Sequence, residues 1–145
     1  MSVSFTPEYE ASARDSEESA AEPLRVVVAD DNIDAAMTLA ALLGLQGHDV
    51  RTAHDGTQAL EEVLRFEPHV VILDIGMPGM NGYKVASALR DRNLDVMLIA
   101  VTGWGQEEDR HRSKAAGFDH HLVKPVDFTT LSDLLAQRAA GRTLH

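Results

Sequence analysis

The chain has no cysteine among its 145 residues, which excludes disulfides and thiolate metal sites. No apolar run approaches the roughly 18 residues of a membrane-spanning helix. The N-terminus also lacks the basic and then hydrophobic segments of a secretory signal. We therefore expect a cytoplasmic protein that makes no contact with a membrane.

Basic residues are scarce as well. Lys and Arg number 13 against 23 Asp and Glu, and the formal net charge is −10. Nonspecific nucleic-acid binding requires clustered Lys and Arg, so we expect no nucleic-acid partner. A glycine-rich phosphate loop and a dinucleotide-binding fingerprint are also absent. A phosphate would therefore arrive on another molecule instead of being held here as a bound nucleotide.

Acidic residues are concentrated at the start of the chain. Residues 1–22 carry six acidic side chains and one basic side chain, among many Ser and Ala. Such a segment buries too little apolar surface to offset the entropy lost on ordering. We therefore expect a disordered acidic tail over 1–22, one folded domain over 23–141 and a short C-terminal tail over 142–145. The apolar content of 44% is enough for a single core.

Apolar runs alternate with helical patterns from residue 24 onward. Strand-helix alternation at this spacing requires parallel strands with right-handed crossovers. An eight-unit barrel needs about 250 residues, so an open sheet is favoured. The sequence predicts an α/β fold, a flavodoxin-like three-layer sandwich whose five-stranded parallel sheet has the order 2-1-3-4-5 with five helices. We expect strands buried on both faces at 24–29, 69–73, 96–101 and 119–123, and a shorter strand at 50–53.

Helix boundaries also have sequence signals. Asp55 with Gln58 three residues later resembles a capping box, and Asp127 is positioned to cap the last helix. Gly44 and Gly47 predict the end of the first helix. Its expected buried face consists of Ile33, Ala36, Met37, Ala40 and Leu43.

Five polar residues follow the predicted strands: Asp30, Asp31, Asp74, Thr102 and Lys124. Taken singly, each could be a helix cap, a turn residue or a surface amine. In an open α/β sheet, however, ligands bind outside the carboxyl ends of the strands. Strands one and three are neighbours in the predicted order, so the three aspartates should converge. Their coincidence at one edge favours a common site.

Three close carboxylates repel one another, and a divalent cation removes that cost. Mg²⁺ is the expected cofactor because it prefers hard oxygen ligands, and the Gly76 carbonyl is a candidate further ligand. One carboxylate could then attack phosphorus to give an aspartyl phosphate. Mg²⁺ and Lys124 would neutralise charge, and Thr102 would donate a hydrogen bond to a phosphoryl oxygen. The spacing of His111, His120 and His121 fits no zinc pattern.

These residues resemble the response regulator receiver domain of two-component signalling, of the single-domain, chemotaxis-regulator-like type. The resemblance covers residues 24 to about 140, and its order and spacing are specific. It implies that Asp74 accepts a phosphoryl group from a kinase phosphohistidine and that Asp30 and Asp31 help to bind Mg²⁺. It also implies a cis peptide between Lys124 and Pro125. The matching motifs are Val-Ala-Asp30-Asp31-Asn, Val-Ile-Leu-Asp74-Ile-Gly-Met-Pro-Gly-Met-Asn-Gly, Ala-Val-Thr102-Gly and Val-Lys124-Pro125.

The chain departs from this family pattern at three positions. The family often has Tyr or Phe three residues before the lysine, as a rotameric switch. His121 stands there, a smaller and polar residue of a type that can titrate near neutral pH. Gly76 and Trp104 occupy positions that resemble those tuning phosphoryl lifetime.

The resemblance also implies partners. No output domain follows the last helix, so we expect a stand-alone receiver whose upstream partner is a histidine kinase or a histidine phosphotransfer protein. It would contact a downstream protein target or act as a phosphate sink in a phosphorelay.

Two other functions use the same residue types. A phosphorylation-independent interaction module would share the fold, but the complete set of acids, Thr102 and Lys124 argues against it. A Mg²⁺-dependent phosphohydrolase often carries a second acid two residues after its nucleophilic Asp, where this chain has Gly76. We therefore expect a phosphoacceptor that acts on itself and is not a conventional turnover enzyme.

Overall fold

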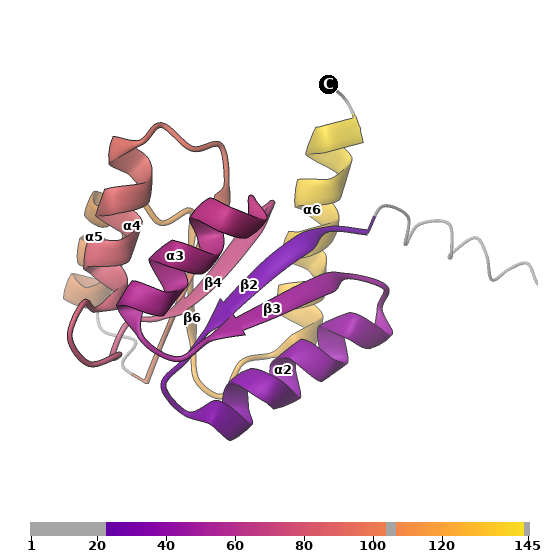
Figure 1. The fold of residues 1–145 in the computed structure, drawn as a ribbon, viewed down its shortest axis with the longest axis horizontal. Helices are drawn as coiled ribbons and strands as arrows, with labels where there is room; N and C mark the ends of the chain where they lie inside the picture. Colours follow the sequence, from indigo (N-terminus) through magenta and orange to yellow (C-terminus); the bar gives the residue numbers. More distant parts are fainter. Residues whose placement is uncertain (1–22, 104–106, 144–145) are drawn as a thin grey trace, which may run out of the picture.

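The computed structural model describes residues 23–103 and 107–143 (Figure 1). The expected tail over 1–22 and Trp104 lie outside the described residues. Strands and helices alternate through the described chain. The elements are β2 (Arg25–Ala29), α2 (Ile33–Leu45), β3 (Asp49–Ala53), α3 (Gly56–Phe66), β4 (Val70–Asp74), α4 (Gly82–Asp91), β5 (Met97–Thr102), α5 (Glu107–Ala116), β6 (His120–Val123) and α6 (Phe128–Thr143).

The five strands form one parallel sheet in the order β3-β2-β4-β5-β6. Counted along the chain, this is the predicted order 2-1-3-4-5, and the flavodoxin-like fold is confirmed. Helices α2 and α6 cover one face, while α3, α4 and α5 cover the other (Figure 1). No helix of the described residues is long and apolar enough to cross a membrane.

The core consists of two apolar layers, one on each face of the sheet. Because successive strand residues point to opposite faces, Val27 packs with α3 and α4 while Val26 and Val28 pack with α2 and α6. Every residue of the central strand β4 is buried. Strand β6 is only partly buried along its length, so the prediction of burial on both faces is wrong for this strand. The reason is its position at the edge of the sheet, where it has one neighbour.

The predicted caps have the expected side chains in place. Asp55 accepts the Gln58 N–H at 2.8 Å, and the Gln58 amide oxygen accepts the N–H of His54 at 3.0 Å. This capping box therefore reaches back to the residue before the cap. Gly44 lies inside α2 instead of ending it; the helix runs through Leu45, and Gly47 follows with a φ of 99°. That left-handed conformation suits glycine, which has no Cβ.

The inward face of α2 differs from the prediction. Ala36 and Leu43 are buried, but Ile33 and Met37 are 53% and 59% exposed. The helix carries one charged residue, Asp34, and is apolar around nearly its whole circumference. Hydrophobic periodicity therefore could not define which side faces the sheet.

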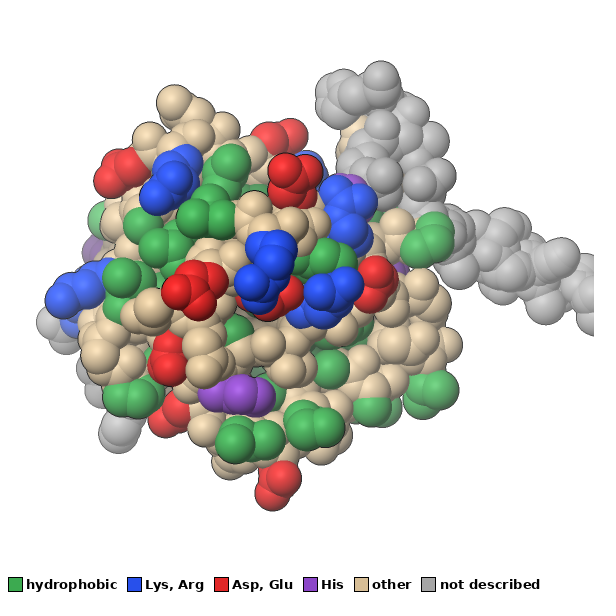
Figure 2. Space-filling view, in the orientation of Figure 1, with side chains coloured by type: hydrophobic (Ala, Val, Ile, Leu, Met, Phe, Trp, Pro, Cys, Tyr) green, Lys and Arg blue, Asp and Glu red, His purple; other side chains and the backbone are tan. Residues whose placement is uncertain are grey.

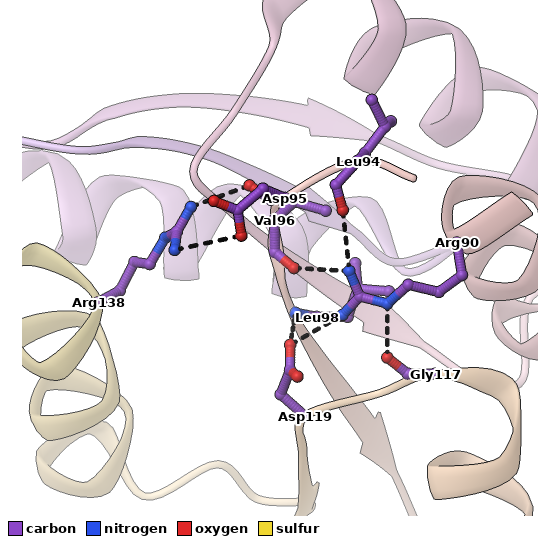
Figure 3. Close-up of polar contacts among 8 residues, drawn as sticks. All are labelled: Arg90, Leu94, Asp95, Val96, Leu98, Gly117, Asp119 and Arg138. Carbon is purple, nitrogen blue, oxygen red and sulfur yellow. Dashed lines mark hydrogen bonds and ion pairs between the residues drawn. The ribbon is translucent and has the colours of Figure 1, made fainter. Parts of the chain in front are cut away.

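An arginine network holds the amino-terminal edge of the sheet (Figure 3). Arg90 donates to the carbonyls of Gly117, Leu94 and Val96 at 2.9, 3.2 and 2.9 Å. Its remaining terminal nitrogen lies 2.9 Å from the carboxylate of Asp119. One guanidinium thus ties α4, the start of β5 and the turn before β6 together, and satisfies loop carbonyls that would otherwise lack partners.

We predict that protonation of His48 destabilises the fold. Its Nδ1 accepts the Leu24 N–H at 3.1 Å and therefore must be unprotonated. Burial lowers the pKa of His48 from 6.5, so the unfolded chain binds the proton first as pH falls. The free energy of unfolding should fall between pH 7.5 and 5.5. It should fall less in His48→Asn, which keeps an acceptor without the titration.

Urea unfolding of both proteins at the two pH values measures this difference. His111→Asn, at an exposed position of α5, is the matched control and should behave like the wild type. An equal acid loss in wild type and His48→Asn would contradict the prediction.

Candidate functional site

The carboxyl edge of the sheet brings the predicted site residues together. Asp30 follows β2, and Asp74 ends the neighbouring β4, one position beyond the last β2–β4 pair. Thr102 ends β5, and its carbonyl accepts the Lys124 N–H at 2.8 Å. Four predicted residues therefore come from four adjacent strand ends, because parallel strands all finish at the same edge.

Two carboxylates are held in matching ways. Asp30 Oδ1 accepts the Asn32 N–H at 2.9 Å, and Asp74 Oδ1 accepts the Gly76 N–H at 3.0 Å. The Oδ2 atoms of Asp30 and Asp74 lie 3.4 and 3.3 Å from the Lys124 ammonium. Both acids are buried, whereas Asp31 is exposed.

The charge of Lys124 follows from these neighbours. Partial burial by itself lowers the pKa of its ammonium, but the negative charges of Asp74 and Asp30 and the hydrogen bonds to them outweigh this effect. The pKa of Lys124 is therefore raised, and the side chain is cationic at neutral pH. A single positive charge thus bridges two buried carboxylates.

The donor set fits a hard divalent cation. One carboxylate oxygen from each of Asp30, Asp31 and Asp74 lies within 4.8 Å of the others. Oxygen donors of this kind are the ligands that Mg²⁺ takes in proteins, usually together with several waters. A carbonyl ligand from Gly76 stays a prediction; the structure shows its N–H on Asp74.

The loop after Asp74 is fixed by two close approaches. A Cβ on Gly56, at the start of α3, would lie 1.8 Å from the Met80 carbonyl oxygen. A Cβ on Gly82 would lie 3.0 Å from the carbonyl oxygen of Asp74. The first contact excludes any side chain at Gly56, and the second would require the backbone beside Gly82 to shift. The loop that flanks Asp74 is therefore packed against two helix ends.

Thr102 and His121 occupy different environments. Thr102 is 5% exposed at the end of β5. His121 Nδ1 lies 2.9 Å from the hydroxyl oxygen of Ser113, a residue of α5 that is 1% exposed. The residue at the family's switch position is thus joined to α5 by a polar contact. The Lys124–Pro125 peptide is cis, the geometry that the resemblance implies.

A cavity of about 730 Å³ opens beside the acidic residues. Its lining includes Asp30, Asp74 and Lys124 and, from α2, Leu39 and Leu42. The acidic residues therefore border a cavity that α2 also lines, with both charged and apolar side chains in its wall.

Sequence reasoning did not identify Ser113 or His54 as parts of this region. His54 Nδ1 lies 3.2 Å from the carbonyl oxygen of Asp30. Neither residue belongs to a local pattern: one is a serine in a polar helix, the other a histidine after a strand. Their contacts join segments that only the folded chain brings together.

The family described as "Response regulator receiver domain" matches residues 26–136. The transcriptional regulatory protein PrrA of Mycobacterium tuberculosis is 37% identical over 113 residues, which cover 78% of this chain and 47% of PrrA. The chain therefore spans about half the length of this curated relative.

Solved structures agree on the fold. Chemotaxis protein CheY4 of Vibrio cholerae superposes with a TM-score of 0.75 at 29% identity, covering 80% of this chain and 98% of CheY4. The co-crystal structure of Ypd1 and the Ssk1 receiver domain of Saccharomyces cerevisiae matches with a TM-score of 0.78 at 20% identity, covering 83% of this chain and 91% of the matched chain. The latter likeness concerns the fold alone.

We predict that removing the Lys124 charge strengthens divalent-cation binding. Its ammonium lies within 3.4 Å of Asp30 and 3.3 Å of Asp74 and repels an incoming cation. Lys124→Met should bind Mn²⁺, a paramagnetic substitute for Mg²⁺, about 3- to 10-fold more tightly. Electron paramagnetic resonance of free Mn²⁺ measures this affinity. Lys114→Met, at an exposed position of α5, should match the wild type, and weaker binding in Lys124→Met would refute the prediction.

Proposed function

Because this chain belongs to the response regulator receiver family, we propose that it accepts a phosphoryl group from a phosphohistidine onto Asp74, with Mg²⁺ held by Asp30, Asp31 and Asp74. Receiver domains of this CheY-like family are signalling modules of two-component systems, not conventional enzymes. They generally bind Mg²⁺ at an acidic pocket. The observation that carries the proposal is the convergence of three aspartates, Thr102 and Lys124 at one sheet edge.

Asp74 is the acceptor in this proposal because it lies at the centre of the group. Its carboxylate oxygen would form a bond to phosphorus as the bond from phosphorus to the donor imidazole nitrogen breaks. The electron pair of that bond stays with the imidazole. The N–H of Gly76 and the ammonium of Lys124 orient the two oxygens of Asp74 before the reaction.

Lys124 and Thr102 would bind the oxygens of the transferred phosphoryl group. Phosphoryl transfer depends mainly on positioning and charge neutralisation. The Lys124 ammonium, already 3.3 Å from Asp74 Oδ2, can pair with a phosphoryl oxygen. The Thr102 hydroxyl, one strand away, can donate to another. When bound, Mg²⁺ supplies further positive charge for the phosphoryl oxygens.

The upstream partner in this proposal docks along α2. Ile33, Met37, Ala41 and Leu45 recur every four residues and are all exposed; we call this set the α2 stripe. Hydrophobic side chains gather over α2 along the lower edge of Figure 2, while Lys and Arg lie over the middle of that view. The helix begins directly after the acidic residues, so a partner on the stripe would reach the site.

A histidine kinase or histidine phosphotransfer protein fits this surface. The Ssk1 receiver domain was crystallised with the phosphotransfer protein Ypd1, and that structure shares the present fold. Exposed apolar surface in a row favours a protein partner over a small phosphodonor. A stand-alone role stays a prediction, because the relative PrrA is about twice as long as the matched segment.

The output would be read on the face built by α5, β6 and α6. Occupation of Asp74 would draw Thr102 toward the phosphoryl group, and His121 lies on the neighbouring strand, paired with Ala100 two residues before Thr102. The Ser113–His121 contact links that strand to α5. We infer that a downstream protein responds to a change at this contact, or that the chain serves as a phosphate sink in a phosphorelay.

We predict that Asp74→Asn abolishes the phosphoryl adduct. Wild type treated with acetyl phosphate and Mg²⁺ should gain one hydroxylamine-sensitive phosphoryl group by intact mass, because only a carboxylate can form the acyl phosphate. Asp91→Asn, at an exposed position of α4, should label like the wild type. Labelling of Asp74→Asn at the wild-type rate would overturn the assignment. Release of many phosphates per chain from varied substrates would indicate a phosphohydrolase instead.

We predict that a charge introduced into the α2 stripe slows phosphoryl transfer from protein donors but not from acetyl phosphate. Met37→Asp should slow transfer from phosphorylated kinases or phosphotransfer proteins by about tenfold or more, since it puts a charge into an apolar contact. Labelling by acetyl phosphate should stay unchanged. Leu64→Asp is the matched control, because Leu64 is an exposed leucine of α3 on the other face of the sheet. Equal transfer rates in all three proteins would place the docking surface elsewhere.

A further inference from the structure

We propose that His54 is a positioning residue for the cation site: its imidazole holds the peptide between Asp30 and Asp31 so that the Asp31 carboxylate faces Asp30 and Asp74. The inference rests on the Mg²⁺-binding part of the proposed function. None of the predicted site residues lies on or directly after β3. In this proposal, the residue that follows β3 contributes to the site through its side chain.

The contact itself has a defined direction. His54 Nδ1 lies 3.2 Å from the carbonyl oxygen of Asp30. A carbonyl oxygen only accepts hydrogen bonds, so the imidazole must carry its hydrogen on Nδ1 and donate it. The N–H of Asp30 in turn donates to the carbonyl of Ala53 at 3.0 Å. The peptide groups on both sides of Asp30 are therefore bound to the end of β3.

The backbone at His54 is itself fixed by hydrogen bonds. Its own N–H donates to the Gln58 side chain at 3.0 Å, and the Gln58 N–H donates to Asp55 at 2.8 Å. These bonds join the end of β3 to the first turn of α3. The imidazole is partly buried between the two segments. The capping box therefore fixes the backbone of His54 independently of the site that the imidazole contacts.

Asp31 is the residue that depends most on this contact. The carbonyl of Asp30 and the nitrogen of Asp31 belong to one planar peptide unit, so fixing the oxygen fixes the direction in which Asp31 leaves the strand. The carboxylates of Asp30 and Asp74 each accept a backbone N–H and pair with Lys124. In the described part of the chain no hydrogen bond or ion pair holds the carboxylate of Asp31. Its place near the other two therefore depends on the direction of the backbone that carries it.

This geometry predicts a selective effect. Loss of the imidazole contact should loosen the exposed ligand Asp31, while Asp74 keeps its hydrogen bond to Gly76 and its ion pair. Cation affinity should therefore fall, but the reactivity of Asp74 should return once the cation is saturating. A purely structural role for His54 would instead lower stability and affect both properties together.

The test compares His54→Leu with His54→Asn. The Asn side-chain amide can place an N–H where Nδ1–H lies, whereas Leu has no donor. Mn²⁺ binding to the full chain, measured by electron paramagnetic resonance, should weaken about 3- to 10-fold in His54→Leu. Binding in His54→Asn should stay within about twofold of the wild type. Thermal melting of all three proteins shows whether the fold is kept.

The rate of labelling by acetyl phosphate, measured against Mg²⁺ concentration, provides a second readout. His54→Leu should need more Mg²⁺ for half-maximal rate and should reach the wild-type maximum. Equal Mn²⁺ affinity in His54→Leu and wild type would overturn the inference, as would equal weakening in both variants. If the affinities differ as expected but Asp74 is never labelled, the acceptor assignment fails while the role of His54 stands.

Discussion

The ion pair between Lys124 and two buried aspartates is the constraint on which the functional edge depends. Asp30 and Asp74 end adjacent strands, and each has lost most of its contact with water. Two carboxylates so placed repel each other, and a nearby positive charge relieves that repulsion. The ammonium of Lys124, within 3.4 Å of both, supplies that charge, and the hydrogen bond from the Lys124 N–H to Thr102 extends the β5–β6 pairing to it. The edge strand β6 thus makes a charged centre tolerable in the middle of the sheet.

The polar groups at the two edges of the parallel sheet are satisfied in different ways. At the amino-terminal edge, Arg90 satisfies three loop carbonyls and the Asp119 carboxylate, so its donors are largely used within the chain (Figure 3). At the carboxyl edge, Asp31 stays exposed, and Lys124 bridges two groups of the same charge. The first arrangement is closed to ligands because its polar groups are paired. The second keeps an excess of negative charge, which favours the binding of a divalent cation.

Much of this fold could be predicted from sequence because parallel strands give strong, local signals. Short branched runs located the strands, and the rule that ligands bind at their carboxyl ends placed Asp30, Asp74 and Lys124 together. The inward face of α2 could not be predicted, since a helix with one charged residue has no polar side to define it. The partial burial of β6 depended on its edge position. The His54–Asp30 contact spans 24 residues and leaves no local pattern.

Different elements around the site affect its loop conformation, its cation affinity and its partner surface. The loop after Asp74 is packed against Gly56 and Gly82, where a Cβ would collide with backbone, so little adjustment is available there. Changes in the properties of the site must therefore come from residues on other elements around it. His54, directly after β3, holds the peptide that follows Asp30 in the proposed cation site, while the α2 stripe faces solvent and offers a surface to the proposed partner. Because His54 acts through the Asp30 carbonyl while the α2 stripe presents its side chains to solvent, a substitution in one can change cation affinity without changing partner choice. A fixed loop beside Asp74, with separately adjustable neighbours, is the arrangement that the proposed phosphoacceptor role requires.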